Sequence, residues 1–534
     1  MNRSACRVAA LCATLLAGSL GAQSTRLVSH TAGDPTTAGN AGLTSSVGDF
    51  AAGRYVAFES PATDLVSGYS GSGGQVYLWD RDAAVLRLVS HVPGSSTIGG
   101  AGQSLLPRWS AGGRYLVFSS LAADLVPGGS DTNGSGDALL WDRLSGNLTL
   151  VSRAAGSPVT AAAGDSLARA ISADGRYVVF DSTATDLVTG GSDGNANEDV
   201  FRWDRVTGAV SLVSRVPGST TTTGNGESRF AAASADGLHV AFVSHATDLV
   251  PGGVDGNGAG DILFRIGETE PLALVSHAAG APTTAADAGS GKPLVSADGC
   301  CVVFVSGATD LIAGGSDANG AADAFFWDHE SGLVRLVSHL PGLETTAATG
   351  ASMPTAISAD GRFVAFFSDA ADLVYGVDTN GVDDAFLWDR DDGTVRLLSH
   401  AAAASATAGN ATSRPTAIGA DARFVALTSR ASDLVAGASD GNSADDVFLW
   451  ERASGTLTLV SRTPAPAATA GNGASTVAAV SADGRGVVFA SQATDLVAGT
   501  DLNGGRDLFW RDASLVFSDG FESGNATAWS NVVP

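Results

Sequence analysis

Groups of positive charge are scarce in this sequence, and lysine is almost absent. Lys and Arg together number 30 against 55 Asp and Glu, so that the formal net charge is −25, and the single lysine is Lys292. Proteins that bind nucleic acids displace counterions with clustered positive side chains, and anionic membranes attract the same clusters. The composition therefore argues against nucleic acids and acidic membranes as partners. Cations are the natural partners of such a surface.

Long apolar runs are also missing, except at the N-terminus. Arg3 and Arg7 precede an apolar run from Val8 to about Ala22, with small residues near its end. This arrangement is typical of a secretory signal peptide with cleavage after Ala22, and the run is short for a membrane span, which needs about 20 apolar residues. We therefore expect residues 1–22 to be a signal peptide. The mature protein is then periplasmic or secreted, without insertion into a membrane.

Cysteine is scarce as well. Of the four cysteines, Cys6 and Cys12 lie in the expected signal peptide, and Cys300 and Cys301 are adjacent. A disulfide between neighbours would strain the backbone, because disulfides favour well-separated Cα atoms. We interpret the pair as two small residues on opposite faces of a strand, and a vicinal disulfide is the alternative. In either case too few cysteines remain for a zinc site.

What the sequence does contain is one unit repeated eight times. The motif Leu-Val-Ser-His or a close variant recurs at steps of 61 or 62 residues, beginning at Leu27, Leu88, Leu150, Leu212, Leu274, Leu336, Leu397 and Leu459. A Ser-Ala-Asp-Gly-Arg turn or a variant recurs in step, and an Ala-Thr-Asp motif or a variant follows each turn, with its Asp at Asp64, Asp124, Asp186, Asp248, Asp310, Asp372, Asp433 and Asp495. A fixed period of this kind predicts a repeat architecture. The copies carry no large insertion, which leaves no room for a separate catalytic domain.

Each copy is expected to form four short strands. In residues 167–215 an apolar stretch is followed by Asp-Gly, which supplies the positive φ of a hairpin turn, and then by the β-branched and aromatic stretch Tyr-Val-Val-Phe. A long loop leads to Asp-Val-Phe-Arg-Trp-Asp, and a short turn leads to Val-Ser-Leu-Val-Ser-Arg. Four antiparallel strands at a fixed period describe the blade of a propeller. The predicted fold class is all-β, a single eight-bladed β-propeller of four-stranded antiparallel blades.

The two ends of the repeat region predict how the ring closes. The first recognisable unit is a lone fourth strand at residues 25–30, and the last unit has three strands and stops at residues 507–512. We expect the N-terminal strand to complete the eighth blade, because its sequence matches the other fourth strands, although residues 514–521 could compete for that edge. The predicted organisation is therefore a signal peptide at 1–22, a propeller at 23–512 and a C-terminal tail at 513–534. A monomer is expected.

Seven copies share an acid-rich loop between their second and third strands, with the pattern Asp-x-Asn-x-x-x-Asp. Calcium takes six to eight hard oxygen ligands from carboxylates, amide and backbone carbonyls and water, and acids at alternate positions of a tight loop can converge on one point. The candidate metal ligands are Asp131, Asn133, Asp137, Asp193, Asn195, Asp199, Asp255, Asn257, Asp261, Asp317, Asn319, Asp323, Asp378, Asn380, Asp384, Asp440, Asn442, Asp446, Asp501, Asn503 and Asp507. We expect calcium as the cofactor. A metal-free turn is the alternative, since Asp, Asn and Gly also favour turns.

Two further features of this loop bear on the calcium prediction. The first copy has Ser-Gly-Tyr-Ser-Gly-Ser-Gly-Gly-Gln in its place, without any Asp, and should not bind an ion. The pattern also lacks the closing Glu of the helix-flanked calcium loop. The Ala-Thr-Asp carboxylates or backbone carbonyls would therefore have to supply the remaining ligands.

Other repeated residues are interpreted as structural. A tryptophan recurs in the third strand of seven copies and is expected to pack between blades rather than to stack a sugar or a base, and Arg265 takes its place in the fourth copy. Histidine ends five of the fourth strands but exchanges with Arg at the others, which argues against a general base or a metal ligand. The polar groups that stand out are all repeated ones. We therefore expect no catalytic residues and a protein that is not an enzyme.

The repeat resembles a known family. The stretches Ser-Ala-Asp-Gly-Arg-Tyr-Val-Val-Phe at 172–180, Asp-Thr-Asn-Gly-Ser-Gly-Asp at 131–137 and Val-Phe-Leu-Trp-Glu-Arg at 447–452 are similar to the TolB-like, WD-repeat-like β-propeller proteins of bacteria. The resemblance covers about residues 25–512 and implies an exported binding or interaction scaffold, whose partner would be a protein or a glycan on the face that carries the long loops. The alternative is a propeller-type hydrolase or lyase that acts on polysaccharide.

Overall fold

The computed structural model describes residues 25–43, 48–464, 469–484, 486–501 and 503–512. The signal peptide and the C-terminal tail expected from the sequence lie outside these residues. The described part of the chain is built from strands and loops, and no helix in it is long and apolar enough to cross a membrane.

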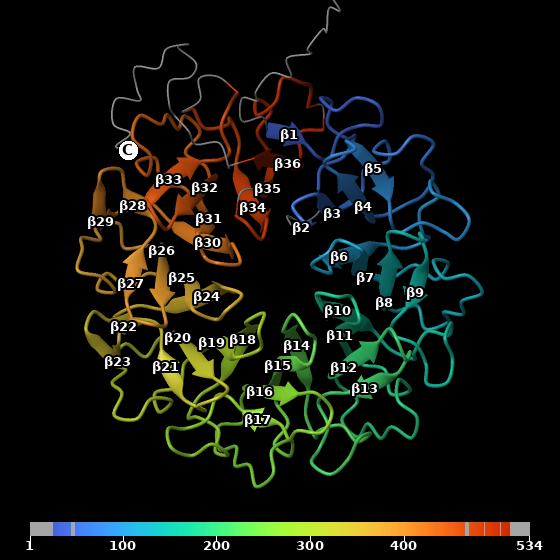
Figure 1. The fold of residues 1–534 in the computed structure, drawn as a ribbon, viewed down its shortest axis with the longest axis horizontal. Coiled ribbons are helices and arrows are strands. Elements are labelled where there is room, and N and C mark those ends of the chain that lie inside the picture. The colour runs from blue at the N-terminus through green and yellow to red at the C-terminus, as the bar shows by residue number, and fades with distance from the viewer. Residues whose placement is uncertain (1–24, 44–47, 465–468, 485, 502, 513–534) are drawn as a thin grey trace, which may run out of the picture.

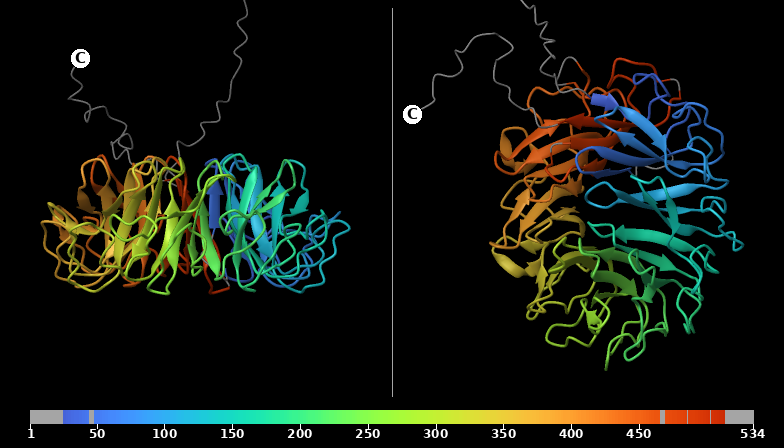
Figure 2. Two further views of the ribbon diagram at one scale, coloured as in Figure 1. Left: turned by 90° about the horizontal axis from the view of Figure 1, so that it is seen from below. Right: turned by 45° about the vertical axis from the view of Figure 1, so that its right-hand side comes forward.

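Eight four-stranded sheets stand side by side in a closed ring around a central axis (Figure 1), which makes a flat disc when viewed from the side (Figure 2). Each sheet is one antiparallel blade. The first four blades consist of β2 (Gly48–Ala51), β3 (Tyr55–Ser60), β4 (Gln75–Asp80) and β5 (Val85–Leu88); β6 (Ser104–Trp109), β7 (Tyr115–Ser120), β8 (Asp137–Asp142) and β9 (Leu148–Leu150); β10 (Ser166–Ile171), β11 (Tyr177–Ser182), β12 (Asp199–Asp204) and β13 (Val210–Leu212); and β14 (Ser228–Ala233), β15 (His239–Ser244), β16 (Asp261–Ile266) and β17 (Ala273–Leu274).

The other four blades continue the ring in chain order. They consist of β18 (Ser290–Val295), β19 (Cys301–Ser306), β20 (Asp323–Asp328) and β21 (Val334–Leu336); β24 (Ser352–Ile357), β25 (Phe363–Ser368), β26 (Asp384–Asp389) and β27 (Val395–Leu397); β30 (Ser413–Ile418), β31 (Phe424–Ser429), β32 (Asp446–Glu451) and β33 (Thr456–Leu459); and β34 (Ser475–Val480), β35 (Gly486–Ser491) and β36 (Asp507–Asp512) with β1 (Thr25–Leu27). Two small hairpins, β22 (His339–Leu340) with β23 (Leu343–Ala347) and β28 (His400–Ala401) with β29 (Ala404–Ala408), lie in the loops that leave blades five and six.

The hydrophobic core is divided among the interfaces between blades. The buried apolar residues form eight clusters, and each cluster combines side chains of two adjacent blades. Trp79 of blade one, for example, packs in one cluster with Val488 and Trp510 of blade eight. The second and third strands are buried on both faces because they lie in the middle of a blade with a neighbour on each side. A single blade could not bury these faces alone, so that the ring is the folding unit.

The N-terminal strand closes the ring, as the sequence predicts. Strand β1 pairs antiparallel with β36, and Arg26 lies opposite Trp510 in the register. The fold class is therefore confirmed as an eight-bladed propeller whose last blade takes its fourth strand from the start of the chain. Closure removes the free strand edges that an open array would expose.

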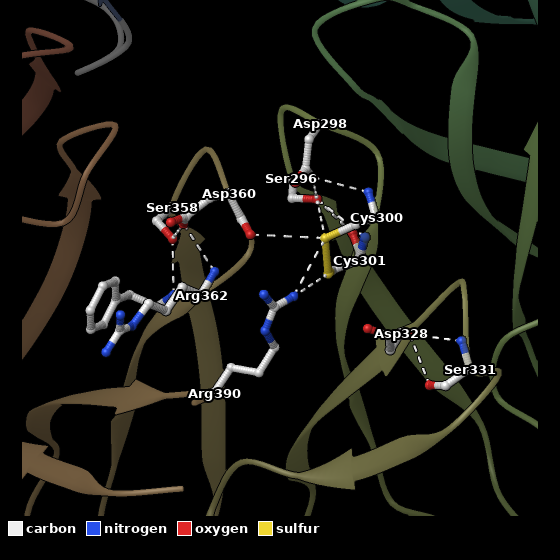
Figure 3. The surroundings of a disulfide bond; sticks show 11 residues. Ser296, Asp298, Cys300, Cys301, Asp328, Ser331, Ser358, Asp360, Arg362 and Arg390 are labelled. Carbon is white, nitrogen blue, oxygen red and sulfur yellow. Dashed lines mark hydrogen bonds between the residues drawn. A yellow bond between two sulfur atoms is a disulfide. The ribbon is translucent and has the colours of Figure 1, made fainter. Parts of the chain in front are cut away.

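The interpretation of Cys300 and Cys301 as two small residues on opposite faces of a strand is wrong, because their sulfur atoms form a vicinal disulfide (Figure 3). The physical reason lies in the repeat. At the same two places blade three has Arg176 and Tyr177, and the tyrosine packs against the hairpin glycine of the next blade. In blade five the disulfide fills that space. A Cβ on Gly361 would lie 2.8 Å from Cys301 Sγ, and the guanidinium Nη1 of Arg390 lies 3.2 Å from the same sulfur.

Candidate functional site in the acid loops

The Asp-x-Asn-x-x-x-Asp segment, called the acid loop below, forms a tight turn that its first Asp stabilises. In blade three Asp193 Oδ1 accepts hydrogen bonds from the backbone N–H groups of Asn195 and Ala196, both at 3.0 Å. The bond to the residue two positions on is present in all seven acid loops. The first Asp therefore has a structural role that needs no metal.

The Asn of the acid loop joins it to the loop that leads from the fourth strand to the next blade, called the inter-blade loop below. Asn195 Nδ2 donates to the carbonyl oxygen of Gly224 at 2.7 Å and to that of Gly226 at 3.2 Å. A β-bridge between Ser192 and Thr222 runs beside this contact. The acid loops and the inter-blade loops thus lie side by side on one face of the disc.

The last Asp of the acid loop opens the third strand and is buried. Asp199 Oδ1 accepts a hydrogen bond from Ser214 Oγ at 2.8 Å, and Ser214 Oγ in turn accepts the N–H of Val200 at 3.0 Å. The serine belongs to the Leu-Val-Ser-His motif, so that the motif and the acid loop recur together because they bond to each other. The same Ser–Asp bond is found in all seven blades that carry an acid loop.

Burial changes the chemistry of these seven carboxyl groups. It raises the pKa of Asp199 from an ordinary 3.8 to about 8, against the lowering effect of the Ser214 hydroxyl, and the nearby Asp193 charge raises it further. The pKa of the equivalent Asp in the other six blades rises to about 7, with burial as the main cause. Each buried carboxyl group therefore favours a proton or a cation as a companion near neutral pH.

Blade one shows how the same contacts are made without any acid. Gln75 takes the place of the last Asp, and its Oε1 accepts the hydroxyl of Ser90 at 2.6 Å. Its Nε2 donates to the carbonyl oxygens of Gly100 at 3.3 Å and Gly102 at 3.2 Å, which is what Asn195 does in blade three. One neutral amide thus replaces both the Asn and the Asp, so that the loop can be held by hydrogen bonds alone.

The Ala-Thr-Asp carboxylates do not complete the acid loop of their own copy. Asp186 Oδ1 accepts the N–H of Ala163 at 2.8 Å, and the same bond to a residue 23 or 24 positions upstream occurs in all eight copies, including the one without an acid loop. The neighbouring charge that raises the pKa of Asp507 comes partly from Asp64, in the next blade around the ring. These aspartates therefore fasten one blade to the next.

Small cavities lie against the acid loops. One of about 20 Å³ in blade five is lined by Asp317 and Asp323, and one of about 20 Å³ in blade four is lined by Asp255 and Asp261. A space of this size holds about one water molecule or ion. Among the described residues no three His, Cys, Asp or Glu side chains gather as a metal centre. An ion here would therefore use two carboxylates, with Asn, backbone or water oxygens completing its shell.

The repeated aromatic and histidine residues have the structural positions expected of them. Trp203 and Trp388 are almost completely buried between blades. His30 and His277 each bring Nδ1 to the carbonyl oxygen of the following residue, at 2.9 Å and 3.0 Å. The tryptophans therefore pack between blades, and the histidines hold the ends of the fourth strands in place.

A group of carboxylates that the sequence analysis missed lies in blade three and does not recur. Asp181 on β11 is 1% exposed, and its Oδ2 accepts Arg169 Nε at 2.6 Å and the N–H of Phe230 at 2.8 Å, whereas its Oδ1 has no hydrogen-bond partner. Burial raises the pKa of Asp181 to about 6 despite the Arg169 charge, and burial also raises the pKa of nearby Glu198. The signal available in the sequence is that the position of Asp181 carries an acid only here and at Glu59 of blade one.

The fold and the repeated site define a β-propeller protein. No protein-family model and no curated protein matches the sequence. Solved structures similar in fold include TolB from Acinetobacter baumannii, at 15% identity over 64% of this chain and 65% of that one with a TM-score of 0.31. An oligogalacturonate lyase in complex with manganese is similar at 12% identity over 75% of this chain and 86% of that one, with a TM-score of 0.36. The resemblance to TolB-like propellers is thus confirmed at the level of the fold.

Other matched structures are larger enzymes. A post-proline cleaving enzyme from Rickettsia typhi matches at 9% identity, with a TM-score of 0.45, over 82% of this chain and 56% of its own length. This chain spans half the length of a prolyl endopeptidase that it also matches, at 12% identity and a TM-score of 0.43. The expectation that the chain is not an enzyme is therefore wrong, since several structures of this fold are named as enzymes. The likeness itself concerns the fold alone.

Proposed function

We propose that this chain is an exported β-propeller that holds calcium in its seven acid loops and uses the loop-bearing face to bind a protein or a glycan. The observation that carries the proposal is the buried Asp at the start of each third strand. Asp199 is 1% exposed, shares its surroundings with the Asp193 carboxylate, and has a pKa raised to about 8 by burial. A carboxyl group in that position is ionised at neutral pH only if a cation compensates it.

The residues fit a calcium ion in composition. Each acid loop offers two carboxylates and one Asn carbonyl oxygen beside backbone carbonyls, all of which are the hard oxygen ligands that calcium prefers. When bound, the ion would supply the positive charge that the loops lack and would stabilise the folded state by mass action, by about 2.7 kcal/mol per site at a hundredfold excess over its dissociation constant. The chain's own contribution is to position the Asp, through the Ser214 hydroxyl in blade three, and to tie the loop to the next blade through Asn195.

Export is supported by two features. The N-terminal sequence has the pattern of a signal peptide, and the Cys300–Cys301 disulfide belongs to an oxidising compartment such as the periplasm or the outside of the cell.

The substitution Asp193→Asn separates calcium from a metal-free turn. Asn retains an oxygen that accepts the two N–H groups of the turn, so that a metal-free turn should keep its stability, whereas a calcium site loses a charge. We expect calcium binding to fall from seven ions to six and the melting temperature in calcium to decrease. Gln75→Glu in blade one is the matched control, because it adds a charge where no acid loop exists. An Asp193→Asn protein with unchanged calcium binding would contradict the proposal.

A second candidate function is a hydrolase or lyase that acts on polysaccharide. The observation that favours it is Asp181, a non-repeated carboxyl group with one oxygen free of hydrogen bonds and a pKa of about 6, since glycoside-cleaving enzymes use carboxyl groups with raised pKa as acids. Incubation with a panel of neutral and acidic polysaccharides tests it. Turnover that Asp181→Asn abolishes, with calcium binding intact, would favour the enzyme over the binding protein.

A further inference from the structure

Three buried arginines lie together between blades three and four. Arg202 on β12, Arg215 directly after β13 and Arg265 on β16 are 4%, 6% and 5% exposed. A related pair, Arg462 and Arg511, lies at the places of Arg215 and Arg265 between blades seven and eight, but the full cluster of three with Glu268 is found only between blades three and four of the described residues. The place of Arg265 is taken by tryptophan in six other blades, as at Trp203 and Trp327, and by Arg511 in blade eight, whereas the place of Arg202 is taken by an apolar residue in the other seven.

One carboxylate pairs with two of the three cations. Glu268, in the turn between β16 and β17, reaches back to the preceding blade, where its Oε2 accepts Arg215 Nη1 at 3.1 Å and its Oε1 pairs with Arg202 Nη2. Ser211 Oγ also donates to Oε1, at 2.8 Å. The carboxylate therefore bridges two guanidinium groups and one hydroxyl, an arrangement that suits the planar fork of arginine.

Arg265 is left without an acid. Its Nη1 donates to the carbonyl oxygen of Glu270 at 3.0 Å, and its buried Nε has no hydrogen-bond partner. Burial, together with the charges of Arg215 and Arg202, lowers the pKa of Arg265 to about 10. Three cations against one carboxylate leave a buried excess of positive charge in a chain whose net charge is −25, and an uncompensated buried charge is costly.

We propose that Arg202, Arg215 and Arg265 form a binding site for the carboxylate of a small acidic ligand, such as a uronic acid. The Glu268 carboxylate occupies this site when no ligand is bound and competes with the ligand. Glu268 already shows that the arginine pair and Ser211 accept a carboxylate. Its side chain is 48% exposed and stands on a short surface turn, so that it can rotate outward without disturbing a strand. An incoming carboxylate then takes its place on Arg202 and Arg215, near the charge of Arg265.

The proposal does not rest on calcium, and its test is carried out in chelator. Isothermal titration calorimetry with glucuronate is compared for the wild-type protein and for Glu268→Gln, which keeps the shape of the side chain but removes the competing charge. We expect Glu268→Gln to bind glucuronate at least tenfold more tightly than the wild type does. Glucose, which lacks the carboxylate, should not bind. Absence of saturable glucuronate binding to Glu268→Gln would overturn the proposal.

Two further variants keep the test decisive if Glu268→Gln is poorly folded. Arg265→Trp restores the residue found at this place in six blades and should fold. We expect glucuronate to raise the melting temperature of the wild type but not that of Arg265→Trp. Arg153→His, a change at the equivalent of Arg215 one blade earlier, is the matched control and should keep that rise. Equal responses of Arg265→Trp and the wild type would overturn the proposal. Tighter binding of sulfate than of glucuronate would overturn the assignment to a carboxylate.

Discussion

Ser29 Oγ donates a hydrogen bond of 2.8 Å to Asp507 Oδ1, 478 positions further along the chain. The same Ser–Asp bond joins the fourth and third strands of six other blades, where the partners are 15 residues apart. The two ends of the repeat region are therefore joined by the contact that holds the interior blades together, and β1 is a full member of blade eight.

Removal of the Ser29 hydroxyl should weaken this closure. Ser29→Ala leaves a buried carboxyl group without its donor, and we expect the free energy of unfolding to fall by about 1–3 kcal/mol. Ser214→Ala, which breaks the same bond inside blade three, is the control and should cost a similar amount. Denaturant titration measures both. A loss for Ser214→Ala with none for Ser29→Ala would contradict closure by the N-terminal strand.

Without calcium, the seven buried Asp should make the protein more stable at acidic pH than at neutral pH, which is the reverse of the usual dependence. The seven buried Asp have a folded-state pKa of about 7 to 8 against an ordinary 3.8, so that the folded protein binds more protons than the unfolded chain between these values. Their contribution is fully present below about pH 4 and is lost as the pH rises through 7 to 8.

In chelator, the melting temperature should therefore decrease from pH 5 to pH 8, and calcium should flatten this decrease by taking the place of the protons. Calorimetric scans at several pH values check both statements. A decrease that is equally steep with and without calcium would count against ion binding at these carboxyl groups.

The hydrogen bonds of the Gln75 amide should stabilise the loop of blade one without an ion. Gln75→Asp keeps an acceptor for Ser90 but removes the donor to the carbonyls of Gly100 and Gly102. We expect a loss of about 1–3 kcal/mol in the free energy of unfolding and no gain of a calcium ion. The measurement is denaturant titration in chelator and in calcium. Equal stability of Gln75→Asp and the wild type would show that the hydrogen bonds of the Gln75 amide do not stabilise the fold.

The vicinal disulfide predicts that the mature protein has no free thiol. Mass spectrometry after alkylation should find both cysteines unmodified until a reductant is added. The double substitution Cys300→Arg with Cys301→Tyr gives blade five the residues of blade three, and its melting temperature should not respond to reductant. Alkylation of the unreduced wild-type protein would contradict the disulfide.

The repeat itself made most of the fold predictable. The period of Leu27 and its equivalents gives the number of blades, and the unpaired strand at residues 25–30 gives the closure. The partners of the acid loop could not be predicted, because Asn195 bonds to Gly224, 29 residues away and across a loop. The contacts of Arg202, Arg215 and Glu268 could not be predicted for a similar reason. Each is a charged residue of a kind that usually lies on the surface, and only the packing of two blades brings the three together.

The number of calcium ions bound per chain shows whether the acid loops are ion sites. The purified protein is dialysed against a calcium-containing buffer, and bound calcium is determined by plasma mass spectrometry beside a melt of the same sample with and without excess chelator. We expect close to seven ions per chain and a marked fall in melting temperature in chelator. A protein that retains no calcium and melts at the same temperature in both buffers would contradict this expectation.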